Sequence, residues 1–275
     1  MKILLINNFH YIKGGSEAVY FNMAEMLVRA GHSVVFFSCT DPRNSSYGSN
    51  DYFVEPNNSV NPLLGALRYI FNGKARRSLE RLIKAERPDI AHIHLFWGGL
   101  SSSILGVLKK HNIPVVHTAH DYRMVCPAYT FRRGDGTVCE KCLGGNYIHC
   151  LTHRCSKGKF AHSALMTFEA FFRKWFIRPI DAIDGFVFVS QFSYEQHLKA
   201  MPALKDKHCI VAHNAIAPPS QDEISTAMGS YYLYFGRLSH EKGLETLINA
   251  FSNLPHLKLK IVGEGDMEQK LRAMV

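Results

Sequence analysis

Short apolar runs alternate with longer amphipathic segments along this chain. The runs are five or six residues long and rich in Val, Ile and Leu, whereas the longer segments repeat apolar residues at helical spacing. This alternation predicts an α/β fold with a parallel, doubly wound sheet that carries helices on both faces. The expected strands are 2–6, 33–38, 89–94, 114–118, 185–189 and 208–212, and the expected helices are 16–30, 63–86 with a break near Gly73, 100–111, 160–180 and 194–201.

A polar stretch rich in Pro and Gly, 217–229, interrupts the alternation and predicts a linker. We therefore expect a first domain at 1–216 and a second, partial domain at 230–275. A doubly wound domain has about six strands, so the second domain either packs on the first or lacks about 100 residues. Its expected elements are strands at 231–235 and 257–262 and helices at 242–251 and 266–274.

Composition and charge limit the cellular locations and the partners that we expect for the protein. No apolar run approaches the roughly 18 residues of a membrane span, and the N-terminal run is too short for a secretory signal, so we expect a cytoplasmic protein. The net charge is +9, and residues 122–178 hold ten Lys and Arg against three Asp and Glu. Such a stretch favours an anionic partner (a lipid surface, a phosphorylated substrate or nucleic acid) or is a solvated basic face.

Gly14 and Gly15 lie between the first expected strand and the first expected helix. At the carboxyl end of a parallel strand, glycines let a ligand approach backbone N–H groups, and the helix N-terminus adds a positive dipole for phosphate. The G-x-G-x-x-G dinucleotide pattern is absent, and a plain flexible turn is the alternative interpretation.

Arg237 and Lys242 occupy the loop between the strand 231–235 and the helix after it. Two cations at this place can hold a diphosphate, Arg through its planar fork and Lys as a point charge. A leaving nucleoside diphosphate gains negative charge as its sugar bond breaks, so fixed cations here lower the barrier. Ordinary surface charges are the alternative interpretation.

Histidines gather near the ends of two strands. His120 and Asp121 follow the strand 114–118, where such a pair can form a hydrogen bond facing a cleft. His92 and His94 alternate on one strand, so their side chains share a face. With His120 they suggest a metal site, and a metallohydrolase is therefore an alternative function, although no carboxylate cluster surrounds them.

Five of the seven cysteines fall within 30 residues, in an insertion expected at about 122–160. A C-x-x-C pair flanked by two further cysteines suits a structural Zn²⁺ site of four thiolates, and a metal would keep a loop-like segment ordered. Free thiols and redox-labile disulfides are the alternatives. The expected ligands are Cys126, Cys139, Cys142 and Cys155, with Cys150 as a fifth cysteine.

The expected helix 160–180 carries Phe168, Phe171, Phe172, Trp175 and Phe176 among basic residues. An aromatic and basic amphipathic helix can lie at a membrane surface. It is equally often a core helix with a wet basic edge, so both interpretations stay open.

Together these features resemble the large retaining glycosyltransferase family with the GT-B architecture, family 4. The match runs from Met1 to about Met267, and its most specific segments are 234–243, which reads YFGRLSHEKG, and 261–265, which reads IVGEG. The cysteine segment resembles one subgroup of the family. The other matching segments are Gly14-Gly15, 89–94, His120-Asp121, Val189-Ser190 and 213–216.

The resemblance implies two Rossmann-like domains with the active site in the cleft between them. It implies retaining transfer of a sugar from a UDP- or GDP-sugar, without a required cofactor, to a glycan or lipid-linked acceptor in cell-surface polysaccharide synthesis. Peripheral attachment to the inner face of an anionic membrane is expected with it. The resemblance assigns His120, Arg237 and Lys242 to catalysis and Gly14, Gly15, Asn214, Gly236, Arg237, Lys242, Gly263 and Glu264 to donor binding.

One part of the family pattern falls outside this sequence. The family's pair of glutamates near the donor sugar, and much of its nucleotide-base pocket, lie beyond Val275. We therefore expect weak or no catalysis from this chain alone, and a non-catalytic fragment or acceptor-binding module is the main alternative. Nucleic-acid binding rests on charge alone, because no sequence motif supports it.

Overall fold

The computed structural model describes residues 1–215 and 229–275. The chain divides into two units, Met1–Ala217 and Pro218–Val275, and each has its own hydrophobic core. The predicted linker at 217–229 lies outside the described residues, apart from Gly229.

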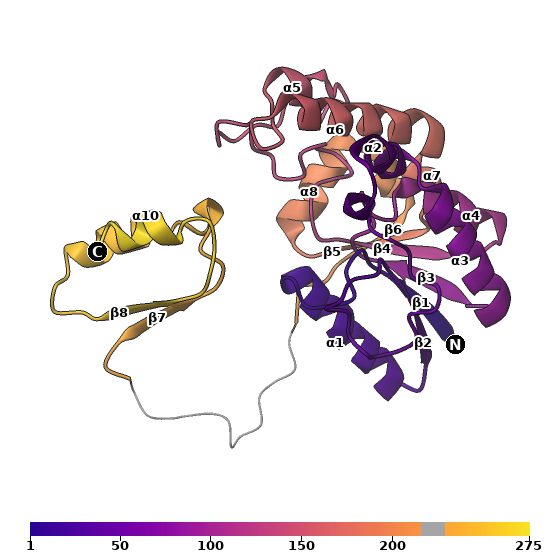
Figure 1. Cartoon of the computed structure of the whole chain (residues 1–275), viewed down its shortest axis with the longest axis horizontal. Coiled ribbons are helices and arrows are strands. Elements are labelled where there is room, and N and C mark those ends of the chain that lie inside the picture. Colours follow the sequence, from indigo (N-terminus) through magenta and orange to yellow (C-terminus); the bar gives the residue numbers. More distant parts are fainter. Residues whose placement is uncertain (216–228) are drawn as a thin grey trace. The chain divides into compact units, whose positions relative to one another are not determined.

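Six parallel strands form the sheet of the first unit, in the order β2-β1-β3-β4-β5-β6 (Figure 1). The predicted α/β fold with a parallel sheet is thus confirmed. The strand order reverses beside β1, which pairs with both β2 and β3. The strands are β1 (Lys2–Ile6), β2 (Ser33–Phe37), β3 (Ile90–Ile93), β4 (Val115–Ala119), β5 (Gly185–Phe188) and β6 (His208–Val211).

Helices cover both faces of this sheet. They are α1 (Gly15–Arg29), α2 (Pro62–Ile70), α3 (Gly73–Glu86), α4 (Leu105–Lys110), α5 (Ile148–Thr152), α6 (Phe160–Phe172), α7 (Pro179–Ala182) and α8 (Gln191–Ala200). Alternate residues of β1 face opposite layers: Leu4 and Ile6 join the core under α3 and α4, whereas Ile3 and Leu5 pack with Tyr20 of α1. Figure 1 shows α1 on one side of the sheet and the α3–α4 pair on the other.

Two predicted helices are divided in the structure. The expected break near Gly73 is confirmed, because α2 ends before Phe71 and Asn72 caps α3. The expected helix 160–180 is wrong beyond α6: it continues as a π-helical turn, Arg173–Ile177, and then breaks at Arg178. Arg178 precedes a proline, a position that disfavours the right-handed helical conformation, and its φ is 51°.

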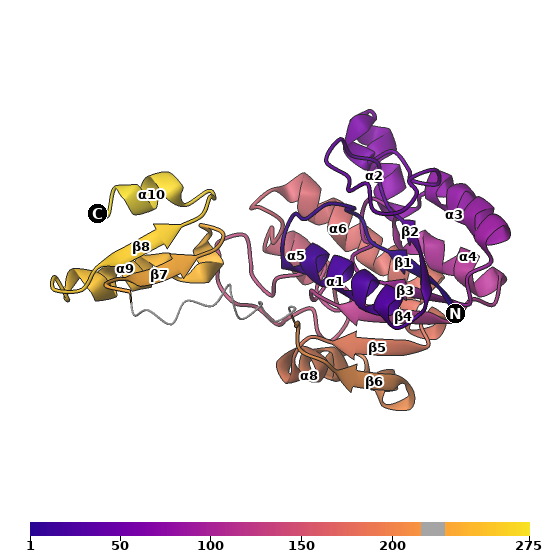
Figure 2. The ribbon, with the colours of Figure 1, turned by 90° about the horizontal axis from the view of Figure 1, so that it is seen from below.

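The predicted insertion between β4 and α6 consists mainly of turns. Its regular parts in the described residues are an isolated bridge between Arg132 and Val138 and the short helix α5. Helix α5 packs on α6, as both views show (Figures 1 and 2). The segment therefore depends on α6 for its support.

The second unit is a parallel pair of strands with two helices, β7 (Tyr232–Phe235), α9 (Leu244–Ser252), β8 (Leu259–Val262) and α10 (Glu268–Arg272). Leu238, Leu244, Ile248 and Leu271 form its core. Its strands keep large apolar side chains exposed: Leu233, Phe235 and Val262. Two strands are fewer than a doubly wound domain needs, as the sequence predicts.

Substitution of Asn72 tests how much the capping hydrogen bonds stabilise the N-terminus of α3. Its Oδ1 accepts hydrogen bonds from the N–H groups of Lys74 (3.1 Å) and Ala75 (3.0 Å), and its Nδ2 donates to the Gly99 carbonyl (2.7 Å). Because all three bonds are lost from a buried position, Asn72→Ala should lower the free energy of unfolding by about 2–3 kcal/mol.

Asn61→Ala is the matched control, because Asn61 is an exposed cap of α2 that accepts one N–H, from Leu64. We expect it to cost about 1 kcal/mol or less. Urea unfolding monitored by the fluorescence of the buried Trp97 compares the two variants. Equal losses would contradict a special role for the buried cap.

Candidate functional site at the carboxyl edge

The carboxyl ends of β1, β3 and β4 meet at one edge of the first sheet. Ligands of open α/β sheets bind at this kind of edge, where the strand order reverses. Two buried asparagines after β1 hold the edge together: Asn7 Oδ1 accepts from the N–H of Leu95 (2.9 Å), and Asn8 Oδ1 accepts from that of Leu100 (3.1 Å). Sequence reasoning missed both, although consecutive asparagines after a buried strand are an available signal.

Three histidine rings are stacked at this edge. The rings of His92 and His94 lie 4.7 Å apart, and those of His94 and His120 lie 5.1 Å apart. His94 Nδ1 is 2.9 Å from His120 Nε2, and His92 Nε2 is 2.8 Å from Thr118 Oγ1. The prediction that His92 and His94 share a face is confirmed.

The predicted hydrogen bond between His120 and Asp121 is wrong. His120 pairs with His94 instead, and Asp121 Oδ1 accepts from the backbone N–H of Arg123 (2.9 Å). The partner of His120 comes from the neighbouring strand, because parallel strands place the ends of β3 and β4 side by side. A pairing of this kind depends on tertiary structure, so neighbours in sequence do not reveal it.

Burial keeps these imidazoles neutral. It lowers the pKa of His120 to about 4, and burial together with the nearby His120 lowers the pKa of His92 to about 4. Burial also lowers the pKa of His94 well below its usual range. At neutral pH the edge therefore presents hydrogen-bonding rings without positive charge.

The metallohydrolase alternative finds no support in this geometry. Within residues 1–215 and 229–275, no group of three or more His, Cys, Asp or Glu side chains is arranged to hold a metal ion. One ring nitrogen of each histidine is engaged elsewhere: His92 Nε2 with Thr118 and His94 Nδ1 with His120.

The glycine loop lies at the start of α1. Gly14 is the extended N-cap residue of this helix, and no side chain caps it. A Cβ added at Gly15 would meet no atom within 4 Å, so packing does not require a glycine there. There is therefore free space beside the first turn of α1, where backbone N–H groups of a helix can bind an anion.

The loop after β7 carries Arg237 and Lys242, and both side chains are exposed. Among the salt bridges of the described part of the chain, neither has an acidic partner. The Ser239 hydroxyl donates to Glu241 Oε1 (2.6 Å) and lowers the pKa of Glu241, and the charges of Arg237 and Lys242 lower it further. Lys242 and Gly243 lead directly into α9, so the cations and the helix N-terminus belong to one loop.

Glycines allow the loops after β7 and β8 to touch. Gly236 and Gly263 have φ values of 147° and 150°, and a Cβ on Gly263 would lie 1.9 Å from the Gly236 carbonyl oxygen. The N–H of Leu238 donates to the Glu264 carbonyl (2.8 Å), which joins the two loops. These glycines and Glu264 therefore have a structural role that the predicted donor-binding role does not require. Asn214 is exposed after β6.

A buried cluster of charged residues contacts the segments that follow β3 and β4. Arg173 Nε donates to Glu169 Oε1 (3.0 Å), and both side chains are almost fully buried. The Arg173 guanidinium also lies 4.7 Å from the centre of the Trp97 ring and 3.4 Å from the Met124 carbonyl oxygen. Arg123 donates to the Tyr69 hydroxyl beside this cluster. The basic stretch 122–178 is therefore not a solvated face throughout, because Arg173 is buried.

The cysteine segment contains free thiols. Burial and the neighbouring thiols raise the pKa of Cys142, and burial raises that of Cys155 to about 12. Burial raises the pKa of the Cys126 thiol despite backbone N–H groups that donate toward its sulfur. The side chains form no metal-holding group within the described ranges, so the structure does not support the predicted zinc site of Cys126, Cys139, Cys142 and Cys155.

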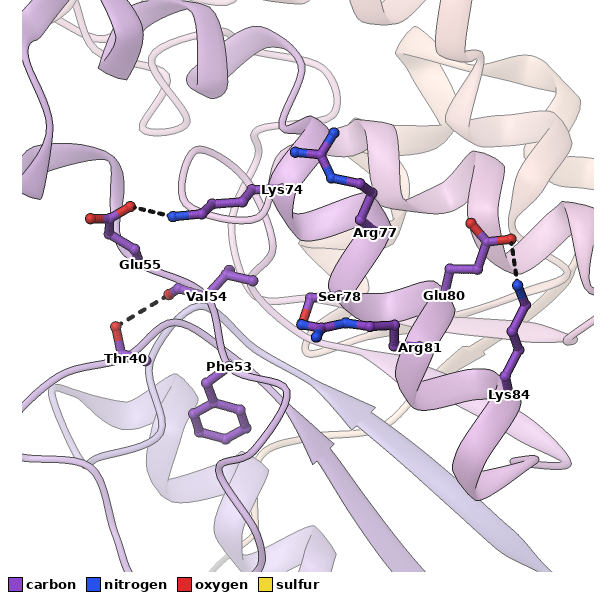
Figure 3. Close-up of a pocket in the computed structure, with 10 residues that line it drawn as sticks. All are labelled: Thr40, Phe53, Val54, Glu55, Lys74, Arg77, Ser78, Glu80, Arg81 and Lys84. Carbon is purple, nitrogen blue, oxygen red and sulfur yellow. Dashed lines mark hydrogen bonds and ion pairs between the residues drawn. The ribbon is translucent and has the colours of Figure 1, made fainter.

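A basic groove of about 820 Å³ lies elsewhere on the first unit, along α3 (Figure 3). Lys74 pairs with Glu55, and Lys84 pairs with Glu80. Arg77 and Arg81 have no acidic partner among the ion pairs of the described residues. The groove contains none of the residues predicted from sequence.

The neutral histidines predict a pH-dependent stability. The folded pKa of His92 is about 4 against 6.5 when unfolded, so the unfolded chain binds this proton first as the pH falls. The contribution is complete above pH 6.5 and is lost toward pH 4, up to about 3 kcal/mol for one histidine. Urea unfolding across this range measures it.

His92→Gln should remove part of this pH dependence, whereas His162→Gln, which changes an exposed histidine, should retain it. The same slope in all three proteins would show that other groups cause the dependence.

Comparison with known proteins adds a relative. The chain is 22% identical over 262 residues to an uncharacterised 42.6 kDa protein in the cps region of Klebsiella pneumoniae. The match covers 89% of this chain and 63% of the relative, so this chain spans less than two thirds of the relative's length.

Solved structures share the fold at low identity. The catalytic domain of starch synthase IV from Arabidopsis thaliana, bound to ADP and acarbose, superposes with a TM-score of 0.56 at 12% identity, over 99% of this chain and 70% of that one. The structure of LpCGTa in complex with UDP gives a TM-score of 0.51 at 14% identity, over 95% of this chain and 70% of that one.

Two family models match the two units in turn. Residues 220–275 match the glycosyl transferases group 1 model, and residues 13–218 match the model of glycosyltransferase family 4. The family 4 match covers most of the chain, including the histidines of the carboxyl edge. The chain therefore belongs to glycosyltransferase family 4, with a GT-B type fold whose second unit is small.

Proposed function

We propose that this chain is part of a retaining glycosyltransferase that moves a sugar from a nucleoside diphosphate sugar to a glycan or lipid-linked acceptor. The observation that carries the proposal is the loop after β7, where exposed Arg237 and Lys242 precede the N-terminus of α9. Cations and helix N–H groups in one loop suit a diphosphate. The family membership supports the same reading.

Each residue has a role in the proposed reaction. As the bond from sugar to phosphate breaks, negative charge grows on the leaving diphosphate, and Arg237 and Lys242 stabilise it. Gly15 leaves room for the donor phosphates beside the N-terminus of α1. His120, as a neutral ring, donates a hydrogen bond to the transferred sugar or accepts one from it. Its hydrogen bond with His94 fixes the orientation of the His120 ring.

The relatives support a proposal for the donor and for the cellular role. We propose UDP or GDP as the nucleotide, with no metal required for catalysis, and LpCGTa was solved with UDP. The relative in a cps region supports a role in surface polysaccharide synthesis. We place the protein in the cytoplasm, on the inner face of the membrane. Among the described helices, none has the length and apolar character needed to cross a bilayer.

An acceptor-binding module without donor binding is the second candidate. The second unit favours it, because a two-stranded sheet with exposed apolar residues is smaller than the doubly wound domain that holds a nucleotide. Nucleotide binding decides between the candidates, because an acceptor-binding module without a donor site should not bind a diphosphate.

Arg237→Ala combined with Lys242→Ala should weaken diphosphate binding at least about tenfold, because two charge-assisted contacts are lost. The measurement is the rise in melting temperature caused by UDP, GDP or inorganic pyrophosphate. Lys258→Ala, an exposed lysine before β8, is the matched control and should bind normally. If none of the three ligands stabilises the wild-type chain, the acceptor-binding module becomes the better reading.

Gly15→Ala separates binding from folding. The added methyl group has free space, so the melting temperature without ligand should stay the same or rise slightly. Stabilisation by diphosphate should fall because the methyl group keeps the phosphate from the backbone.

Gly31→Ala should behave in the opposite way. Gly31 has a φ of 81°, so alanine there costs about 1 kcal/mol of stability and leaves diphosphate binding unchanged. Normal diphosphate binding by Gly15→Ala would exclude Gly15 from the donor site.

A further inference from the structure

Helix α6 buries two hydroxyl side chains and exposes two of its four phenylalanines, whereas Phe171 and Phe172 are half-buried. It buries Ser163 and Thr167, whose hydroxyls donate to the carbonyls of Lys159 (2.9 Å) and Tyr147 (3.4 Å), and it exposes Phe160 and Phe168. A helix at a water-facing surface normally buries its aromatic residues and exposes its hydroxyls. The exposed side of α6 is therefore suited to an apolar environment.

The π-helical turn after α6 extends this exposed side. Its wider bond runs from the N–H of Arg178 to the carbonyl of Arg173 (2.8 Å), and within this turn Arg173 is buried whereas Trp175 and Phe176 are exposed. These two side chains are 63% and 72% exposed. Inserted residues of this kind occur frequently at functional sites.

Helix α2 adds a second row of apolar residues beside the first. Leu63, Leu67 and Phe71 follow one another at helical spacing and are exposed. The Phe71 ring meets that of Phe172 at 6.4 Å, and Phe172 meets Phe176 at 5.1 Å, so the two rows are continuous. Figure 1 shows α2 beside α6, and the two helices pack on each other. The α2–α6 face consists of Leu63, Leu67, Phe71, Phe168, Trp175 and Phe176.

The charge around the α2–α6 face is positive. Lys157, Lys159, Lys174 and Arg178 are exposed at the two ends of α6, and Glu169, the single acidic residue in 157–178, is buried against Arg173. Asp181, which pairs with Arg178, is the nearest exposed acid in sequence. Aromatic rings next to lysines suit the boundary between lipid headgroups and acyl chains.

We propose that the α2–α6 face binds the surface of an anionic lipid bilayer, with Trp175 and Phe176 entering the headgroup region. The charge favours this occupant over a second copy of the chain, since two such faces would bring like charges together. Binding to the bilayer brings the proposed transferase to a lipid-linked acceptor. Only this biological role rests on the proposed function; the binding itself does not. Vesicle binding needs neither donor nor acceptor, so either proposal can fail without the other.

The test uses the whole chain and vesicles of phosphatidylcholine, alone or in an equimolar mixture with phosphatidylglycerol. We expect binding to the anionic vesicles in flotation, weaker binding at high salt, and a blue shift of tryptophan fluorescence with quenching by brominated lipid. The chain has two tryptophans, and Trp97 is buried, so the shift reports Trp175.

Trp175→Ser combined with Phe176→Ser should weaken vesicle binding at least about tenfold, because two apolar side chains leave the interface. Ile12→Ser combined with Phe192→Ser is the matched control, since both residues are exposed elsewhere, and it should bind normally. Lys174→Glu should weaken binding to anionic vesicles, whereas Lys205→Glu should not.

Three results would overturn the proposal. They are absence of binding to anionic vesicles, undiminished binding by the Trp175 and Phe176 double variant, and vesicle binding without a change in tryptophan fluorescence. A wild-type dimer in sedimentation that becomes monomeric in the double variant, without any vesicle binding, would assign the face to a second copy of the chain instead. The double variant exposes no new core, so its melting temperature checks that folding is intact.

Discussion

The buried guanidinium of Arg173 joins three parts of the first unit that are far apart in the chain. It bonds to Glu169 of α6, reaches the Met124 carbonyl after β4 and stacks over Trp97 after β3. A buried charge is tolerated only with such partners, and removing one of them typically costs about 3–5 kcal/mol. The carboxyl edge, the cysteine segment and α6 therefore share one anchor.

The anchor lies where the predicted helix 160–180 departs from a regular α-helix. The sequence leaves open whether this helix keeps its aromatic residues in the core or at a membrane surface. In the structure Arg173 bonds to Glu169 one turn earlier and lies over Trp97, and the π-helical turn that begins at Arg173 leaves the next two aromatic residues exposed. A local pattern cannot contain this constraint, because Trp97 is 76 residues away.

The strands, the break before α3 and the restart after residue 229 could all be predicted from sequence, because each has a local cause. Apolar runs define the strands, and Asn72 caps the helix that follows it. The partner of His120 and the contact between Gly236 and Gly263 could not be predicted, because neighbouring strands create them. The spacing of the cysteines is visible in the sequence, but spacing alone does not determine whether four sulfurs surround one point.

The strand order of the first sheet has a consequence for synthesis of the protein. After β1 and β2 have paired, β3 adds to the free edge of β1, and β4, β5 and β6 each add to the strand made just before. The sheet can thus grow in one direction as the chain leaves the ribosome, and it is complete with Val211. The sheet of the first unit contains no strand of the second, so the nascent chain can bury the core under the carboxyl edge before the loop after β7 has been translated.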